Sequence, residues 1–366
     1  MSGREEGNPT RRTNVNNLIR RVKKKEVRKQ GVSSKAKRAM TQAEFQRMQN
    51  ILQNHNKNRL IWRYGLYSLT NFQFHLIGQI DDTTQVLIEN IQIHNSFPNA
   101  LKTRLSWTKN VTEERDAPWQ IVLGSADPAF DVLTTLGLWL EMHFRWNPNV
   151  AGGVKSKNMA RAAFTSIFKM EEFAAGGAAP VGLGSHSIRK FAVTRHSRRS
   201  GCSKDERSLR GRWKSRRHVA DVYEDTELPY PDAKVAELLC IGGACYYLFL
   251  EELNTTNTAG DNFAAAGGVG GVVSTIAMMK TSILSNVVPN IQKRMSDAVA
   301  LVLGSKALLW LIYSSYDNKN HIVPEDFKQE IKMEWNEIIM ASVVGVDCDA
   351  VGYNPIKKVP VVVTGN

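Results

Sequence analysis

Apolar residues recur every three or four positions along much of the chain, which predicts a mainly helical protein. The first such helix has a clear start, because Thr41 can act as its N-cap and Glu44 stands three residues later. We expect this helix to run through about Leu52. The same spacing predicts further helices on both sides of Gly201 and in residues 131–144, 158–173, 232–253, 274–315 and 325–343.

The pattern changes between residues 60 and 123. Helical spacing begins at Leu60, and we place a polar turn near Asp81 and Asp82, followed by a second amphipathic helix. Side chains then alternate in LKTRLSWTKN and again in WQIVLG, with the charged stretch TEERDA between them. Alternation in two neighbouring segments predicts a small antiparallel hairpin. The expected fold class is therefore mainly α with a small antiparallel β hairpin or sheet.

Composition divides the chain into four regions. Residues 1–40 are basic and polar, so we expect a disordered tail. Residues 41–253 form the main folded domain, residues 254–273 a Gly-rich linker, and residues 274–366 a helical C-terminal appendage to which the sequence assigns no role.

The net charge of +13 is concentrated in two places. Residues 1–40 hold 13 Lys and Arg against 3 acids, and residues 186–218 hold 12 against 2. Two cationic blocks favour a polyanion such as nucleic acid, although a solvated tail and an incidental basic helix would give the same counts. The basic first 40 residues are unlike a signal peptide, so we expect no secretion. The uncharged stretch at 262–279 is dense in Gly, Ala, Ser and Thr, so we expect no membrane span. The four cysteines form no C-x-x-C pair, so we expect no structural zinc site.

One group of residues suggests chemistry. The segment GSHSIRK at 184–190 contains His186 and Arg189, which lie on one helix face and could touch one phosphate. The pattern H-x-x-R is weak alone, since His196 begins a second instance. GRWKS at 211–215 and Tyr223 follow, and a tyrosine phenol is a suitable nucleophile for cutting and rejoining DNA.

Taken in this order, these residues resemble the tyrosine recombinases over about residues 41–235, and GSHSIRK and GRWKS are similar to the Crypton and DIRS transposon branch. The resemblance implies that Tyr223 attacks a DNA phosphate to give a 3′-phosphotyrosyl ester. Arg189 would hold the nonbridging oxygens, and His186 would assist proton movement. Trp213 would brace the phosphate, and Lys109 would protonate the leaving 5′ hydroxyl. It further implies a nuclear protein of mobile-element origin that acts in DNA recombination or integration, without cofactor or metal.

The sequence departs from the family at its first arginine. The family has a motif of the R-I-S-E-L type, but the matching text here is QIDDT, which begins at Gln79. A neutral amide brings no charge, and the loss of one fixed cation costs about 2 to 4 kcal/mol, roughly a hundredfold to a thousandfold in rate. Cleavage should be impaired unless another cation, such as Arg115, takes its place. The helical domain that usually precedes the catalytic one is also replaced by the basic tail.

Several alternatives stay open. Tyr230, Tyr246 and Tyr247 compete with Tyr223 for the role of nucleophile. A series of basic residues forms either a DNA-backbone face or a solvated surface: Lys190, Arg195, Arg198, Arg199, Arg207, Arg210, Arg212, Arg216 and Arg217. The chain is a recombinase that forms a homo-oligomer on double-stranded DNA, a DNA-binding derivative that has lost cleavage, or an unrelated basic nuclear scaffold.

Overall fold

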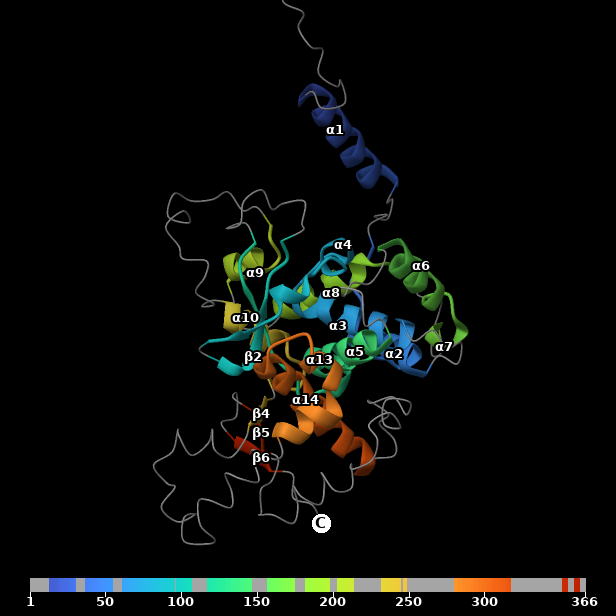
Figure 1. Cartoon of the computed structure of the whole chain (residues 1–366). Coiled ribbons are helices and arrows are strands. Elements are labelled where there is room, and N and C mark those ends of the chain that lie inside the picture. The colour runs from blue at the N-terminus through green and yellow to red at the C-terminus, as the bar shows by residue number, and fades with distance from the viewer. Residues whose placement is uncertain are drawn as a thin grey trace, which may run out of the picture. The chain divides into compact units, whose positions relative to one another are not determined.

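The computed structural model of the chain is drawn in Figure 1. It describes residues 13–30, 37–54, 61–95, 97–106, 117–146, 157–174, 182–197, 203–213, 232–244, 246–248, 280–316, 351–354 and 359–362. The chain divides into two compact units, residues 1–38 and residues 39–366.

The first unit contains helix α1 (Thr13–Gln30), in a region that we expected to be disordered. Residues 13–30 carry an apolar stripe that a count of charges does not reveal. Val15, Leu18, Ile19 and Val22 follow helical spacing, and the last three keep 62%, 43% and 47% of their surface exposed. Helix α1 is therefore a basic helix with an uncovered apolar side.

The second unit is mainly helical. Its helices of eight or more residues are α2 (Gln42–Asn54), α3 (Tyr67–His75), α5 (Val132–Trp146), α6 (Lys157–Ile167), α8 (His186–Ser197), α10 (Asp232–Leu239) and α14 (Asp297–Tyr316). The capping box predicted for α2 is confirmed, since the Glu44 amide donates to Thr41 Oγ1 at 3.1 Å and the Thr41 amide donates to Glu44 Oε2 at 2.8 Å. A π-helical stretch (Ile61–Leu66) leads into α3.

The turn that we expected at Asp81 and Asp82 lies earlier. The chain reverses at residues 76–79, where Ile77 has a positive φ of 47°, and both aspartates lie inside the short helix α4 (Ile80–Thr83). Acidic residues stabilise the first turn of a helix, so this pair begins α4 and does not mark a turn. The expected second amphipathic helix is also wrong, because a single 3₁₀ turn (Ile88–Asn90) leads directly to the sheet.

A three-stranded antiparallel sheet follows, in the order β1 (Gln92–His94), β2 (Phe97–Thr103) and β3 (Gln120–Val122). The hairpin predicted between the two alternating segments is confirmed, with Lys102 paired to Ile121. The expected fold class, mainly helical with a small antiparallel sheet, is therefore confirmed. The predicted helix at 232–253 is shorter than expected, because α10 is followed by β4 (Tyr246–Leu248), which pairs with β5 (Val351–Asn354) and through it with β6 (Val359–Val362).

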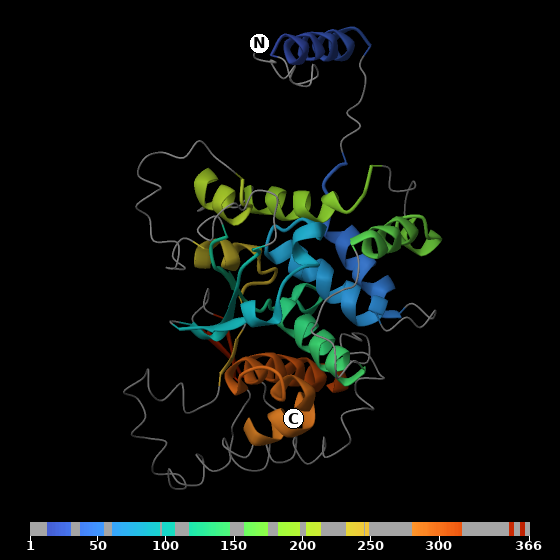
Figure 2. The same ribbon diagram turned by 45° about the horizontal axis from the view of Figure 1, so that its top comes forward.

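Helix α14 belongs to the same core as α5, as Figures 1 and 2 show. Lys306 of α14 pairs with Asp131 at 2.9 Å, and both side chains are buried. Asp131 also caps α5 by accepting from the Leu133 amide at 3.1 Å. Residues 283–309 therefore complete the core of the second unit, and a boundary near residue 254 does not separate them from it.

Two glycines let α5 and its neighbours approach closely. A Cβ on Gly137 would lie 3.1 Å from the carbonyl oxygen of Leu303, and a Cβ on Gly304 would lie 2.6 Å from Ile283. Glu141 of α5 adds a polar joint, because its carboxylate accepts from the amides of Asn290 and Ile291 at the start of α13 (Pro289–Gln292). The C-terminal segment is thus fixed by packing and by buried polar contacts.

Candidate functional site

Helix α8 carries the first predicted pair of site residues. It begins at His186, which is exposed, and Arg189 follows one turn later with only 7% of its surface accessible. The buried Ile188 holds the helix in the core, and Gln73 of α3 donates to the carbonyl oxygen of Ser185 at 2.9 Å. The start of α8 is therefore anchored to α3, with the histidine in solvent and the arginine inside.

The guanidinium of Arg189 is buried and incompletely bonded. Its Nη2 donates to the carbonyl oxygen of Gly211 at 2.5 Å, and its carbon lies 4.7 Å from the ring centroid of Trp213. Its Nε has no hydrogen-bond partner, and no carboxylate forms an ion pair with it among the described residues. Burial lowers the pKa of Arg189, and the nearby carboxylate of Asp82 partly offsets this effect. A buried cation that forms no direct ion pair within the described part of the chain is costly, which indicates a place for an anion.

The loop after α9 (Lys204–Arg210) places Trp213 over this guanidinium. Gly211 ends the helix, and Arg212 takes a positive φ of 52°, so that the Trp213 amide returns to the carbonyl oxygen of Ser208 at 2.9 Å. A Cβ at Gly211 would lie 2.4 Å from the Trp213 ring, so glycine is needed there. The indole keeps 38% of its surface exposed and can reach a ligand from solvent.

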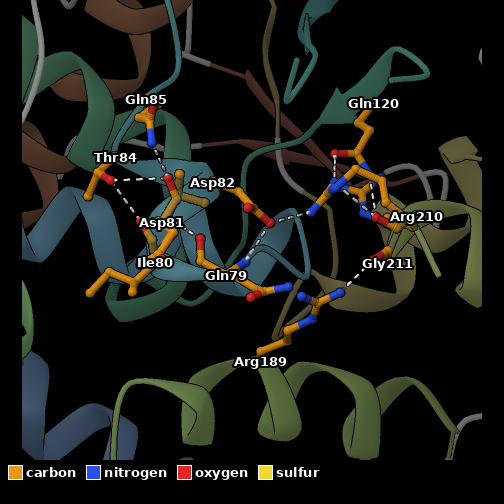
Figure 3. Close-up of polar contacts among 12 residues, drawn as sticks. Gln79, Ile80, Asp81, Asp82, Thr84, Gln85, Gln120, Arg189, Arg210 and Gly211 are labelled. Atoms are coloured by element: carbon orange, nitrogen blue, oxygen red, sulfur yellow. Dashed lines mark hydrogen bonds and ion pairs between the residues drawn. The ribbon is translucent and has the colours of Figure 1, made fainter. Parts of the chain in front are cut away.

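Gln79 lies at the start of α4, where the family resemblance placed the absent arginine. In Figure 3 its amide and the guanidinium of Arg189 point toward one another, from the start of α4 and from α8. The backbone N–H of Gln79 donates to Asp82 Oδ2 at 3.3 Å. Gly78 allows the tight approach, because a Cβ there would lie 2.5 Å from Thr83. Gln79 is therefore close to the predicted phosphate site but brings no charge.

Asp82 and Arg212 form a second buried pair beside Arg189. Arg212 Nη2 lies 3.8 Å from Asp82 Oδ2, and Arg212 Nη1 donates to Gln120 Oε1 of β3 at 2.9 Å. Burial raises the pKa of Asp82, an effect that Arg212 and Arg189 oppose. Burial lowers the pKa of Arg212 to about 9, with Asp82 acting in the opposite direction. Arg189, Asp82 and Arg212 are therefore electrostatically coupled within one small cluster.

Arg210 and Arg212 do not belong to an exposed DNA-backbone face, so the prediction is wrong for these two residues. The side chain of Arg210 is fully buried and pairs with Asp232 Oδ2 at 2.6 Å. It also donates to the carbonyl oxygens of His75 and Ile121, both at 2.9 Å. Arg210 therefore ties α9, α10, α3 and β3 together, a role that a linear pattern of charges does not reveal.

Only some of the other predicted basic residues lie in the part of the chain that the structure describes. Lys190 is exposed, Arg207 is half-buried, and the half-buried Arg195 donates to Gln42 Oε1 of α2 at 3.3 Å. Six predicted residues lie outside the described residues: Lys109, Arg198, Arg199, Arg216, Arg217 and Tyr223.

Four residues of the cluster escaped the sequence analysis as site residues: Gln73, Asp82, Gly211 and Gln120. Gly211 was visible as the first residue of GRWKS, and Asp82 left a signal because it stands three residues after Gln79 and so returns to the same helical turn. Gln73 and Gln120 act through contacts with residues about 90 or more positions away, which no local pattern encodes.

Comparisons with known proteins give structural similarities. The chain is similar to a solved structure described as "Flpe-Holliday Junction Complex", with a TM-score of 0.46 and 14% sequence identity, over 80% of this chain and 68% of that chain. No family model matches the sequence, and no curated protein matches it. Within the described residues, no group of three His, Cys, Asp or Glu side chains is placed to hold a metal ion. No described helix has the length and apolar character needed to cross a bilayer.

Proposed function

We propose that the protein binds double-stranded DNA and that Arg189 holds one backbone phosphate at the cluster formed by α4, α8 and the end of α9. The observation that carries the proposal is the buried Arg189 guanidinium, which has an unused donor and no ion-pair partner among the described residues. An arginine can offer two parallel N–H groups to two phosphate oxygens. The half-exposed Trp213 lies against the same guanidinium and would border the bound phosphate.

The chemistry that we propose for this site is that of a tyrosine recombinase of mobile-element origin, of the Crypton or DIRS type. The Tyr223 oxygen would form a bond to phosphorus while the bond to the 5′ oxygen breaks. The phenolic proton would pass toward His186, and Lys109 would give a proton to the departing 5′ oxygen. Reversal of these steps rejoins the strand, since the 3′-phosphotyrosyl ester keeps the energy of the original bond. Such a protein would act in the nucleus, as several copies assembled on DNA.

A duplex with a nick beside the cleavage point tests this chemistry, because the short cleaved fragment diffuses away and traps the covalent ester. We expect a protein–DNA adduct that survives denaturation in the unchanged chain and is absent in Tyr223→Phe. Tyr230→Phe is the matched control, since Tyr230 is a competing phenol nearby in the sequence. An adduct that persists in Tyr223→Phe and is lost in Tyr230→Phe would assign the nucleophile differently.

Gln79 favours a second candidate function. In this alternative, the chain is a DNA-binding protein of the same origin that no longer cleaves DNA. The amide cannot replace a charge, so cleavage should be about a hundredfold to a thousandfold slower than with arginine. Gln79→Arg should therefore raise the rate of adduct formation if the other groups are in place. Tight binding without an adduct, in both the unchanged chain and Gln79→Arg, identifies the derivative that only binds DNA. Duplex affinity that survives Arg189→Ala with Lys190→Ala would instead indicate an unrelated basic scaffold.

A further inference from the structure

We propose that Arg212 is a positioning residue of the phosphate site, whose positive charge offsets the carboxylate of Asp82 now that no arginine stands at position 79. It acts by holding the carboxylate of Asp82, so that Arg189 keeps its charge for a bound phosphate. The inference rests on the proposed function, because it concerns the same phosphate.

Asp82 stands between two guanidinium groups. It is 5% exposed, and its Oδ2 lies 3.8 Å from Arg212 Nη2 and 3.3 Å from the backbone nitrogen of Gln79. Arg189 also attracts this carboxylate, although the two do not form an ion pair. The carboxylate is therefore shared, and Arg212 is the closer partner.

The net charge of the cluster depends on Arg212. Arg189 and Arg212 together carry two positive charges and Asp82 carries one negative charge, so the cluster keeps one positive charge for a phosphodiester. Without Arg212, Asp82 would become the countercharge of Arg189, and the cluster would be neutral. Gln79 cannot prevent this, because its side chain is an uncharged amide.

The backbone at Arg212 points to a role beyond ordinary helix termination. A positive φ of 52° after a helix is the conformation in which glycine is the usual residue, and an arginine there is strained. The strained residue is held by Gln120 Oε1 at 2.9 Å and by the carbonyl oxygen of Arg210 at 3.1 Å. These contacts direct the guanidinium into the interior beside Asp82, and the side chain is only 3% exposed.

A cycle of variants separates this electrostatic role from a purely structural one. The measurements are the equilibrium affinity for a short fluorescent duplex at fixed salt and the thermal midpoint of each variant. We expect Arg212→Gln to weaken binding by about tenfold. Asp82→Asn with Arg212→Gln should return the affinity to within about threefold of the unchanged chain, because the carboxylate that needed a partner is gone. Arg145→Gln, at an exposed position on α5, is the matched control for the loss of one arginine.

Because Arg212 is proposed to act through Arg189, the effect of its substitution should depend on Arg189. In an Arg189→Gln background, Arg212→Gln should weaken binding no further, since Arg212 acts through Arg189. If Arg212→Gln does not fold, Arg212→Lys keeps the charge, and we expect it to bind more tightly than Arg189→Gln.

The proposal is overturned if Asp82→Asn with Arg212→Gln binds as weakly as Arg212→Gln, or if a folded Arg212→Lys binds as weakly as Arg189→Gln. Failure of the proposed function looks different, because duplex affinity would then be unchanged in Arg189→Gln itself.

Discussion

At the scale of single residues, His75 makes stability depend on pH. Its ring is fully buried, and Nε2 lies 2.8 Å from the carbonyl oxygen of Phe130. Burial lowers the pKa of His75 from 6.5 to about 4. The unfolded chain therefore takes up the proton first as the pH falls, so acidification through this range favours unfolding.

We expect the free energy of unfolding to fall by about 2 kcal/mol between pH 7.5 and pH 5 on account of this one group. His75→Gln should remove that part of the pH dependence while it keeps a donor for Phe130. Urea unfolding at the two pH values measures the difference. His186→Gln changes an exposed histidine and serves as the control. An equal pH dependence in His75→Gln and the unchanged chain would contradict the assignment.

The candidate site shows what a sequence can reveal about single residues. The spacing of His186 and Arg189 is a local pattern, and the family resemblance singled out Trp213 and Gln79. The contact of Trp213 with Arg189 was not predicted by either. Burial does not follow from them. Arg210 and Arg212 resemble their basic neighbours in the sequence, and only long-range contacts turn them inward.

At the scale of elements, a buried ion pair between Lys306 and Asp131 joins α14 to the start of α5. Removal of one partner of a buried ion pair leaves an uncompensated charge and typically costs about 3 to 5 kcal/mol. Lys306→Ala should therefore lower the free energy of unfolding by about that amount, measured by urea denaturation. Lys293→Ala, at an exposed position after α13, should change it by less than about 0.5 kcal/mol.

Substitution of Asp131, the ion-pair partner of Lys306, gives a second test of the buried pair. Asp131→Asn keeps an oxygen that can cap α5 but removes the negative charge. Combined with Lys306→Met, it should recover part of the stability that Lys306→Ala loses. A separate unfolding transition for the C-terminal segment in Lys306→Ala would contradict the single core.

The elements themselves were predicted unevenly. Helix α2, the β2–β3 hairpin and α5 follow from caps and periodicity, because the signals for their starts and turns are local. The strands β5 and β6 do not, since β5 pairs with β4, about 100 residues earlier in the chain, and β6 joins the sheet through β5. The early turn at residues 76–79 depends on the positive φ of Ile77. A β-branched residue rarely adopts a positive φ, so the sequence does not predict a turn there.

At the scale of the whole molecule, the surplus of positive charge should govern how DNA binding responds to salt. Four exposed basic residues of α1 contribute to it: Arg20, Arg21, Lys23 and Lys24. If all four contact phosphates, their replacement by glutamine should reduce the slope of log affinity against log salt by up to about 3.6. Leu18→Gln with Val22→Gln leaves the charge unchanged and is the control. An unchanged slope in the charge variant would show that α1 does not touch DNA.

The positions of charged residues can be counted from the sequence, whereas the packing of one segment against another cannot. Counting Lys and Arg needs no structure, so the two basic blocks were visible at once. The division at residue 254 followed composition, and composition does not show that residues 283–309 pack against α5.

The close contact at Gly137 and Gly304 limits how the protein can change over time. A methyl group at Gly137 would need a small shift of Leu303, and one at Gly304 would need a larger shift of Ile283 or Val288. If residues 283–309 were replaced by those of a distant relative, we expect them to pack well only where glycine is present at both positions 137 and 304. Substitutions in α5 and in residues 283–309 are therefore expected to depend on one another.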